Sequence, residues 1–311
     1  MNQGGGDMGA LVKNELNLSL RKKGIRVLFA ISILILVLWI GTTYHGASQK
    51  LYLGASYEET GLNLLEPNRI FSYYMFNLTT SIYIFPFIFL GMILVGSDLK
   101  NKIYLNICSV TKNRNKYILV KIITTLIINL LFLITILLLS ITISILLPNI
   151  RDKSLTDLFS LYKIFSFLIF WLGLSGLSIG SMGLTYFFKS NVAGASLAIY
   201  ILLERIYTSA SAISLQNPIL MKINEYLPWC NFNTLFVYAS KLKYLTSSLS
   251  HEELLNEASV LNMFRIIEYH NTHVAYPFFK DLRLIIIICS LYIIVFLLLF
   301  ATGFKKRIKE G

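Results

Sequence analysis

Long runs of apolar residues alternate with shorter polar segments along the whole chain. An α-helix needs about 20 apolar residues to cross a bilayer core of roughly 30 Å, and six runs are long enough. Transmembrane strands would alternate polar and apolar residues, and these runs do not. The pattern therefore predicts an all-α integral membrane protein that forms a single transmembrane domain over residues 1–311. Its six predicted transmembrane helices lie at about residues 27–44, 76–96, 118–147, 161–188, 192–213 and 284–303.

Two further segments are apolar on one side but too polar to cross a membrane. In residues 7–22 the apolar side chains gather near one helical face, which predicts a helix lying in the membrane interface. The alternative for this segment is a disordered basic tail. Residues 214–283 are apolar and aromatic in their first part and amphipathic over 251–269, which predicts helices or a re-entrant hairpin between spans five and six. Pro86 is expected to kink the second span.

Composition and charge agree with a membrane location and predict an orientation. The chain is 55% hydrophobic and 14% charged, with a mean hydropathy of +0.65, so it has too little charge for the surface of a soluble protein. Sixteen of the 28 basic residues, but only four of the 16 acidic ones, lie on the side that carries both termini and the loop at 97–117. Cytoplasmic loops are enriched in Lys and Arg. Both termini are therefore expected in the cytoplasm, with the chain in the plasma membrane and no nucleic-acid partner.

Motifs for catalysis and for metal binding are missing from the sequence. There is no GxxxxGK[ST] loop for ATP, and no CxxC pair among the three cysteines. Glu268, His270 and His273 form a pattern of low specificity that does not predict a metal site. The chain is expected to hold no cofactor and to catalyse no reaction of its own.

Polar residues inside the predicted spans are either packing contacts or part of a substrate path. Asn129 can hydrogen-bond to a neighbouring helix or line such a path. Glu204 and Arg205 can contact substrate, or their side chains can reach the outer interface. Span four carries glycines on one smooth face, which favours close helix contact within the chain or between copies. These glycines are Gly173, Gly176, Gly180 and Gly183.

The segment SDLKNKIYLNICSVTKNRNKYILVK, residues 97–121, is basic but has an apolar side. A short helix with Tyr104, Ile107 and Cys108 on that side could dock into a groove of a soluble partner. A loop that only anchors the chain at the membrane would attract lysines but would not need these apolar positions.

This segment resembles the cytoplasmic loop between spans two and three of ABC-2 type transporter permeases, in which a coupling helix contacts an ATPase. Lys102 and Thr111 depart from the family pattern, which has glycine and proline there. The positions that match are the acid Asp98, the small apolar run 107–109, Arg114 and Lys121. The six spans, the interfacial helix and the outer segment also fit this family.

The resemblance implies that the chain is the membrane subunit of an ABC exporter. Two P-loop ATPase chains would bind ATP and Mg²⁺ and dock on residues 98–114, and a second permease, identical or homologous, would complete the path. The composition of the outer segment favours an amphipathic peptide, antibiotic or lipid-like substrate. Two alternatives remain open: a non-transporting sensor or immunity protein that binds a peptide at residues 214–283, and an ion-coupled transporter.

Overall fold

The computed structural model describes residues 8–79, 84–101, 114–156, 158, 160–214, 226–228, 231–232, 235 and 282–310. Every regular element in these residues is helical, as the apolar pattern predicts. The elements in chain order are α1 (Met8–Arg21), α2 (Lys23–Tyr52), α3 (Tyr57–Thr60), the 3-10 helix η1 (Leu62–Leu65), α4 (Pro67–Thr79), α5 (Phe85–Lys100), α7 (Arg114–Leu146), α8 (Leu161–Phe188), α9 (Asn191–Ser214) and α15 (Leu282–Glu310).

Four of these helices are long and apolar enough to cross a membrane, among the residues that the structure describes. They are α2, α7, α8 and α15, and they correspond to the predicted spans 27–44, 118–147, 161–188 and 284–303. The predicted span 192–213 coincides with α9, in which the residues with described side chains, Asn191–Glu204, form an apolar helix. The helices of the described residues are therefore compatible with a membrane protein, as the apolar pattern predicts.

The predicted second span, residues 76–96, is divided between two helices. α4 ends at Thr79 and α5 begins at Phe85, so a single helix with a kink at Pro86 is wrong. Pro86 lies in the first turn of α5, where a missing backbone N–H removes no hydrogen bond of the helix. With 16 residues, α5 is about 24 Å long, which is less than the thickness of a bilayer core.

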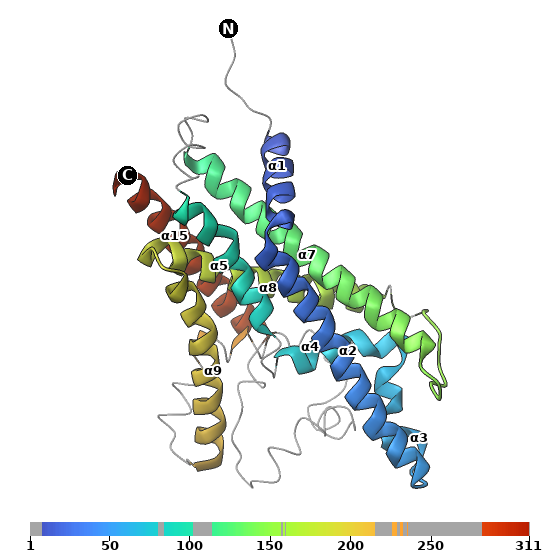
Figure 1. The fold of residues 1–311 in the computed structure, drawn as a ribbon. Coiled ribbons are helices and arrows are strands. Elements are labelled where there is room, and N and C mark those ends of the chain that lie inside the picture. Colours follow the sequence, from blue (N-terminus) through green and yellow to red (C-terminus); the bar gives the residue numbers. More distant parts are fainter. Residues whose placement is uncertain are drawn as a thin grey trace.

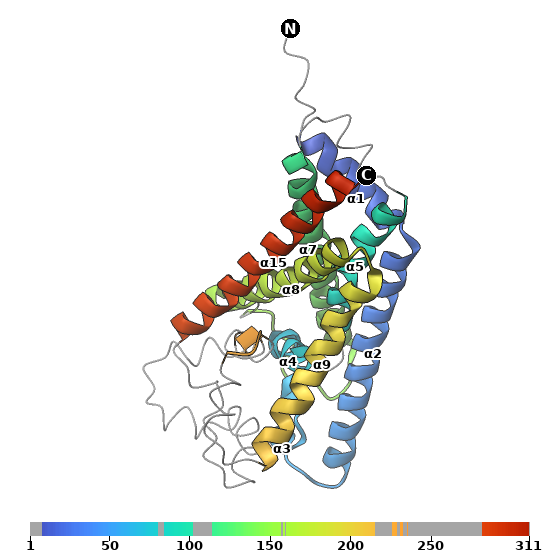
Figure 2. The same cartoon turned by 90° about the vertical axis from the view of Figure 1, so that its left-hand side faces the viewer.

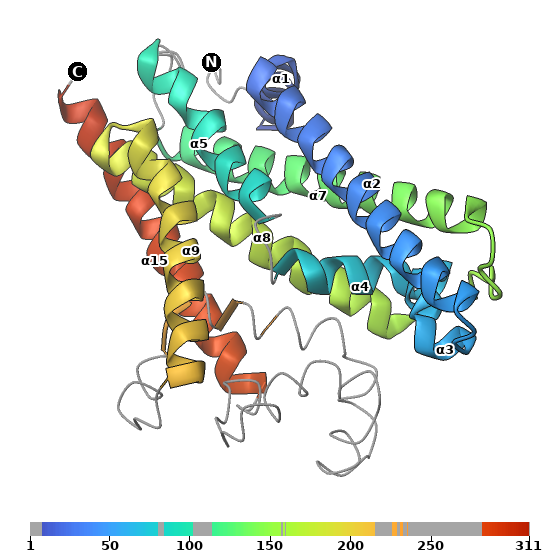
Figure 3. The ribbon, with the colours of Figure 1, turned by 60° about the horizontal axis from the view of Figure 1, so that its bottom comes forward.

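Helix α8 occupies the centre of the molecule, and α5, α7, α9 and α15 all pack against it (Figure 3). In the most apolar 18-residue stretch of α8, 61% of the residues are buried within the chain. In the corresponding stretch of α15, 22% are buried. α8 therefore contacts mainly other helices, whereas most of the apolar stretch of α15 is not buried by the rest of the chain.

The close approach of α5 to α8 depends on Gly91 of α5. A Cβ atom built on Gly91 would overlap the backbone carbonyl oxygen of Ser178 and lie 3.2 Å from Cγ of Met182. The hydroxyl of Ser178 also donates a hydrogen bond to the carbonyl oxygen of Phe87, at 2.6 Å. Backbone therefore contacts backbone at this crossing, as is common where small residues line a membrane helix interface.

The helix ends gather at two ends of the bundle (Figures 1 and 2). α1, the last turns of α5 and α15, and the first turns of α7 lie at one end, which we call the loop end. α3 and the last turns of α9 lie at the opposite end. The segments that are richest in basic residues thus share one end of the molecule.

Helix α1 is held against α7 instead of standing apart from the bundle. Of the residues on its predicted apolar face, Leu11, Val12 and Leu16 are half-buried, whereas Leu20 is 39% exposed on the outer side. The inner side also contains Glu15, which is 7% exposed. The helix is therefore present as predicted, while its place in the membrane interface stays a prediction.

Candidate functional site

Four charged side chains meet inside the protein at the loop end. Glu15 comes from the middle of α1, Lys22 from the junction of α1 and α2, Asp98 from the last turn of α5 and Lys121 from α7. We call these four residues the charge cluster. Burial of ions is tolerated only when each has a partner, and here two positive charges meet two negative ones.

Lys121 is the centre of the charge cluster. Its side chain is completely buried, and its ammonium group donates to Oε1 of Glu15 at 2.5 Å. The same Nζ atom pairs with Oδ2 of Asp98 and lies 3.4 Å from the carbonyl oxygen of Leu94. One lysine therefore ties α7 to both α1 and α5.

Lys22 is the second cation of the charge cluster and pairs with the other carboxylate oxygen of Asp98. Its Nζ atom donates to the carbonyl oxygen of Leu94 at 2.7 Å and to Oδ1 of Asp98 at 3.3 Å. Asp98 also accepts a hydrogen bond from the hydroxyl of Ser97, and Glu15 accepts one from the hydroxyl of Ser19. Both carboxylates thus have a cation and at least one neutral donor.

Asp98 and Lys22 lie outside the predicted spans, and their pKa values reflect the balance within the cluster. Burial alone would raise the pKa of Asp98, but the ammonium groups of Lys121 and Lys22 outweigh it and hold that pKa below its usual value. The pKa of Lys22 is lowered by burial and then by the nearby charge of Lys121, against the opposing attraction of Asp98 and Glu15. Asp98 is therefore ionised at neutral pH.

Tyr117 connects the charge cluster to the rest of the bundle. Its hydroxyl donates to Oδ2 of Asp98 at 2.8 Å and lies 2.6 Å from the hydroxyl of Tyr186 in α8. Its ring stacks on that of Phe304 in α15, with ring centroids 4.7 Å apart and planes 7° from parallel. The cluster is thus in contact, through one phenol, with α8 and α15.

The phenol of Tyr117 provides a direct test of this connection. We expect Tyr117→Phe to lower the free energy of unfolding by about 1–2 kcal/mol, because Asp98 and Tyr186 each lose a hydrogen-bond partner while the stacking on Phe304 is kept. Thermal unfolding of the purified protein in detergent measures the loss. Tyr162→Phe, at a 40% exposed position of α8, is the matched control. Equal midpoints for both variants would contradict the assigned role.

The predicted coupling residues fall into two groups. Asp98 and Lys121, 23 positions apart in the chain, meet in a buried ion pair. Arg114 begins α7, and its side chain lies outside the described residues. Tyr104, Ile107 and Cys108 also lie outside them, within residues 102–113. The docking role of this loop stays a prediction.

Sequence reasoning missed half of the charge cluster. Glu15 had a visible signal, because an acid at this position lies among the apolar residues of an amphipathic helix, one turn after Leu11. Nothing local distinguishes Lys22 from its basic neighbours. Tyr117 and Tyr186 also carry no local signal, since their pairing depends on how α7 and α8 cross.

The glycine face of α8 packs within the chain. A Cβ atom on Gly176 would lie 2.8 Å from Cγ1 of Ile293, and one on Gly180 would lie 3.0 Å from the ring of Phe296, both on α15. A Cβ atom on Gly183 would lie 3.1 Å from the α15 backbone, and Gly173 is buried. Of the two alternatives for these glycines, the structure shows the contact within one chain.

Asn129 makes the interhelical hydrogen bonds that a packing role requires. Its side-chain amide donates to the hydroxyls of Ser178 and Ser175 in α8, at 3.0 and 3.3 Å. The residue is completely buried between α7 and α8. A place for Asn129 in a substrate path stays a prediction.

Glu204 is buried in α9, at 4% exposure. It interacts with Tyr200, one turn earlier in the same helix, and with Tyr292 of α15. The side chain of Arg205 lies outside the described residues. Their role in contacting a substrate also stays a prediction.

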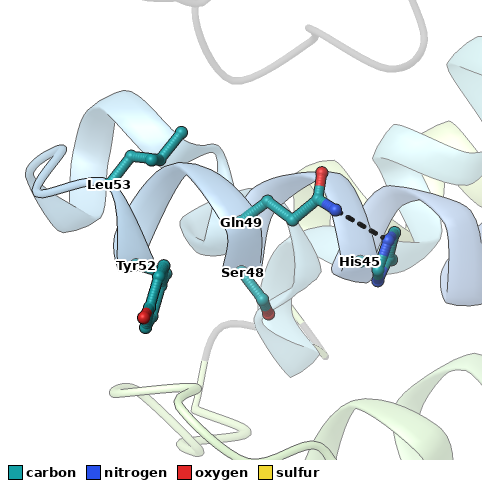
Figure 4. Close-up of a pocket in the computed structure, with 5 residues that line it drawn as sticks. All are labelled: His45, Ser48, Gln49, Tyr52 and Leu53. Carbon is teal, nitrogen blue, oxygen red and sulfur yellow. Dashed lines mark hydrogen bonds between the residues drawn. The ribbon is translucent and has the colours of Figure 1, made fainter.

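A surface hollow of about 450 Å³ lies at the end of α2 (Figure 4). His45, Ser48, Gln49, Tyr52 and Leu53 line it, and Gln49 is hydrogen-bonded to the ring of His45 at 3.0 Å. Ligand sites usually enclose most of a ligand's surface. Because this hollow is lined by a single helix end, we assign no ligand to it.

Comparisons of this chain with protein-family models, with curated proteins and with solved structures find no match.

Proposed function

We propose that the chain is the membrane-spanning permease subunit of an ATP-driven exporter of the ABC-2 type. ATP and Mg²⁺ would be bound by two separate ATPase chains, and a second permease would form the other half of the substrate path. The apolar and aromatic composition of residues 214–283 favours an amphipathic cargo, such as a peptide, an antibiotic or a lipid-like molecule. The expected location is the plasma membrane with both termini in the cytoplasm.

The observation that carries this proposal is the bracing of the two helices that flank the loop at 102–113. α5 leads into the loop and α7 leads out of it, and Asp98 and Lys121 pair these helices in the protein interior. Glu15 and Lys22 add α1 and the start of α2 to the same cluster. A partner that binds the loop would therefore act on four helices together.

Tyr117 would extend this action to the centre of the bundle. Its contacts with Asp98, Tyr186 and Phe304 connect the braced helices to α8 and α15. Nucleotide binding to an ATPase docked on the loop and substrate binding among the spans would then bias the same conformational equilibrium. Such coupling is allosteric in the strict sense, because two separate ligands act on one pair of states.

Substitution of Ile107 tests the docking role. We expect Ile107→Asp to weaken capture of the ATPase roughly 30-fold, which corresponds to about 2 kcal/mol for the loss of an apolar anchor. Transport should fall together with capture. The measurement is co-purification of ATPase subunits with the tagged chain, together with transport by reconstituted vesicles. Lys112→Ala is the matched control, because a solvated charge at the rim of an interface contributes little.

The possible outcomes separate the proposal from its alternatives. Membrane insertion should be unchanged in both variants, since one loop residue cannot outweigh the sixteen basic residues that set the orientation. Normal capture and transport by Ile107→Asp would show that the loop is only an anchor. Capture of no ATPase by the unmodified chain would favour the sensor or immunity protein. Transport that continues without ATP but stops when an ion gradient is removed would identify an ion-coupled transporter.

A further inference from the structure

The outer side of α1 and of the first turn of α2 carries four exposed basic side chains. They are Lys13, Arg21, Lys23 and Arg26, and we call them the basic strip. In α1 the buried carboxylate of Glu15 marks the side that packs on α7, and the helical spacing places Lys13 and Arg21 on the opposite side. The basic strip therefore faces away from the bundle.

Three members of the basic strip gather at the bend between α1 and α2. Lys22 at this bend has an extended backbone, with φ −61° and ψ 124°, and the chain changes direction there (Figure 2). Its ammonium group points inward to Asp98, whereas Arg21 and Lys23 on either side of it are exposed. The guanidinium of Arg26 donates to the carbonyl oxygen of Arg21 at 2.8 Å, which holds Arg26 at the end of α1.

The acids of the loop end do not neutralise the basic strip. Glu15 and Asp98 are the acidic side chains that the structure describes at this end, and both are buried with the two lysines of the charge cluster. Within the described part of the chain, no member of the basic strip forms an ion pair. At the opposite end, by contrast, the exposed Arg69 lies 3.8 Å from Glu66. The positive charge of the strip therefore suits an anionic partner.

Apolar side chains are exposed next to the basic strip. Leu18 is 60% exposed and Leu20 is 39% exposed, and the helical spacing places them on either side of the strip in α1. On α2 the exposed side becomes apolar after the first turn, beginning with Val27 at 46% and continuing with Leu34 at 57%. Basic residues bordered by exposed apolar ones fit the boundary between phospholipid headgroups and acyl chains. A soluble anionic partner would not account for the exposed leucines.

We propose that the basic strip binds the headgroups of anionic phospholipids, with Leu18, Leu20 and Val27 against the acyl chains. The cytoplasmic leaflet is the anionic one, so the strip would meet such lipids if the loop end is cytoplasmic, as the basic residues predict. Because α1 also supplies Glu15 to the charge cluster, a lipid bound on its outer side would stabilise its contact with α7 on the inner side. This inference goes beyond the proposed transport function and does not depend on it.

Native mass spectrometry of the full chain, released from a nonionic detergent, tests the proposal. Titration with phosphatidylglycerol, and separately with phosphatidylcholine of the same acyl chains, gives an apparent Kd for the first bound lipid. We expect phosphatidylglycerol to bind more tightly. The double variant Arg21→Gln/Lys23→Gln should weaken its binding roughly 25-fold, because each basic residue near an anionic surface contributes about fivefold. The thermal unfolding midpoint of this variant should stay close to that of the unmodified chain, since both side chains are exposed.

Lys50→Gln/Lys153→Gln is the matched control, since it removes two exposed lysines at the opposite end of the molecule. It should leave the affinity for phosphatidylglycerol unchanged. Glycerol 3-phosphate carries the charge without the acyl chains and should not displace the lipid at millimolar concentration. Equal affinity for the two lipids, an unchanged Kd in Arg21→Gln/Lys23→Gln or an equal loss in the control would overturn the proposal. Displacement by glycerol 3-phosphate would also overturn it, by showing a site for free anions.

Discussion

Replacement of Lys121 by methionine is expected to destabilise the protein more than any other single change in the charge cluster. Methionine has a similar length but leaves Glu15 and Asp98 with the single cation of Lys22 between them. Removal of one partner from a buried ion pair costs about 3–5 kcal/mol, because a charge is left uncompensated. We expect the midpoint of thermal unfolding in detergent to fall by on the order of 10 °C.

Two further variants show whether charge balance is the cause. Lys100→Met removes an exposed lysine near the end of the same α5 and should leave the midpoint nearly unchanged. Addition of Glu15→Gln to Lys121→Met leaves Asp98 paired with Lys22 and should recover part of the loss. Two results would argue against a cluster stabilised by balanced charge. One is a double variant that is no more stable than Lys121→Met, and the other is Lys121→Met with the stability of the unmodified chain.

A single methyl group at Gly91 is expected to separate α5 from α8. The new Cβ atom of Gly91→Ala would overlap the backbone carbonyl of Ser178, and backbone cannot move aside as a flexible side chain can. The helices must shift apart, which also stretches the hydrogen bond from Ser178 to Phe87. Overpacking of this kind costs about 1–3 kcal/mol, and we expect the upper part of that range. Thermal unfolding in detergent again provides the measurement.

Gly41→Ala is the matched control for Gly91→Ala. Gly41 lies inside α2, and a Cβ atom built on it meets nothing within 4 Å. The same chemical change there should be neutral or slightly stabilising, because alanine favours the helix over glycine by about 1 kcal/mol. If Gly91→Ala were as stable as Gly41→Ala, the close crossing of α5 and α8 would be wrong.

If the proposed function holds, the residues of the charge cluster both stabilise the protein and couple ATP hydrolysis in the ATPase chains to transport. Asp98 and Lys121 brace the helices on both sides of the loop, and Tyr117 contacts two more helices. A variant that loosens the cluster should therefore weaken the response of transport to ATP before it prevents membrane insertion. Ile107→Asp should differ from such a variant by leaving the stability of the protein unchanged.

Helix formation and membrane character followed from the sequence alone. Runs of about 20 apolar residues are what a helix needs to cross a bilayer core, and a helix satisfies all of its backbone hydrogen bonds within the segment. The boundaries of α8, Leu161–Phe188, coincide with the predicted span 161–188. The division of residues 76–96 between α4 and α5 was not foreseen, because apolar composition does not reveal where a helix begins and a proline is tolerated in its first turn.

The sequence also determined which residues had to find partners, but not which partners they found. A lysine in an apolar helix and an acid on the inner face of an amphipathic one are each too costly to bury alone, so a pairing could be expected for Lys121 and for Glu15. That they meet each other, with Asp98 and Lys22, depends on the way α1, α5 and α7 converge at the loop end. Contacts between residues 106 positions apart are set by helix packing, and no local pattern carries that information.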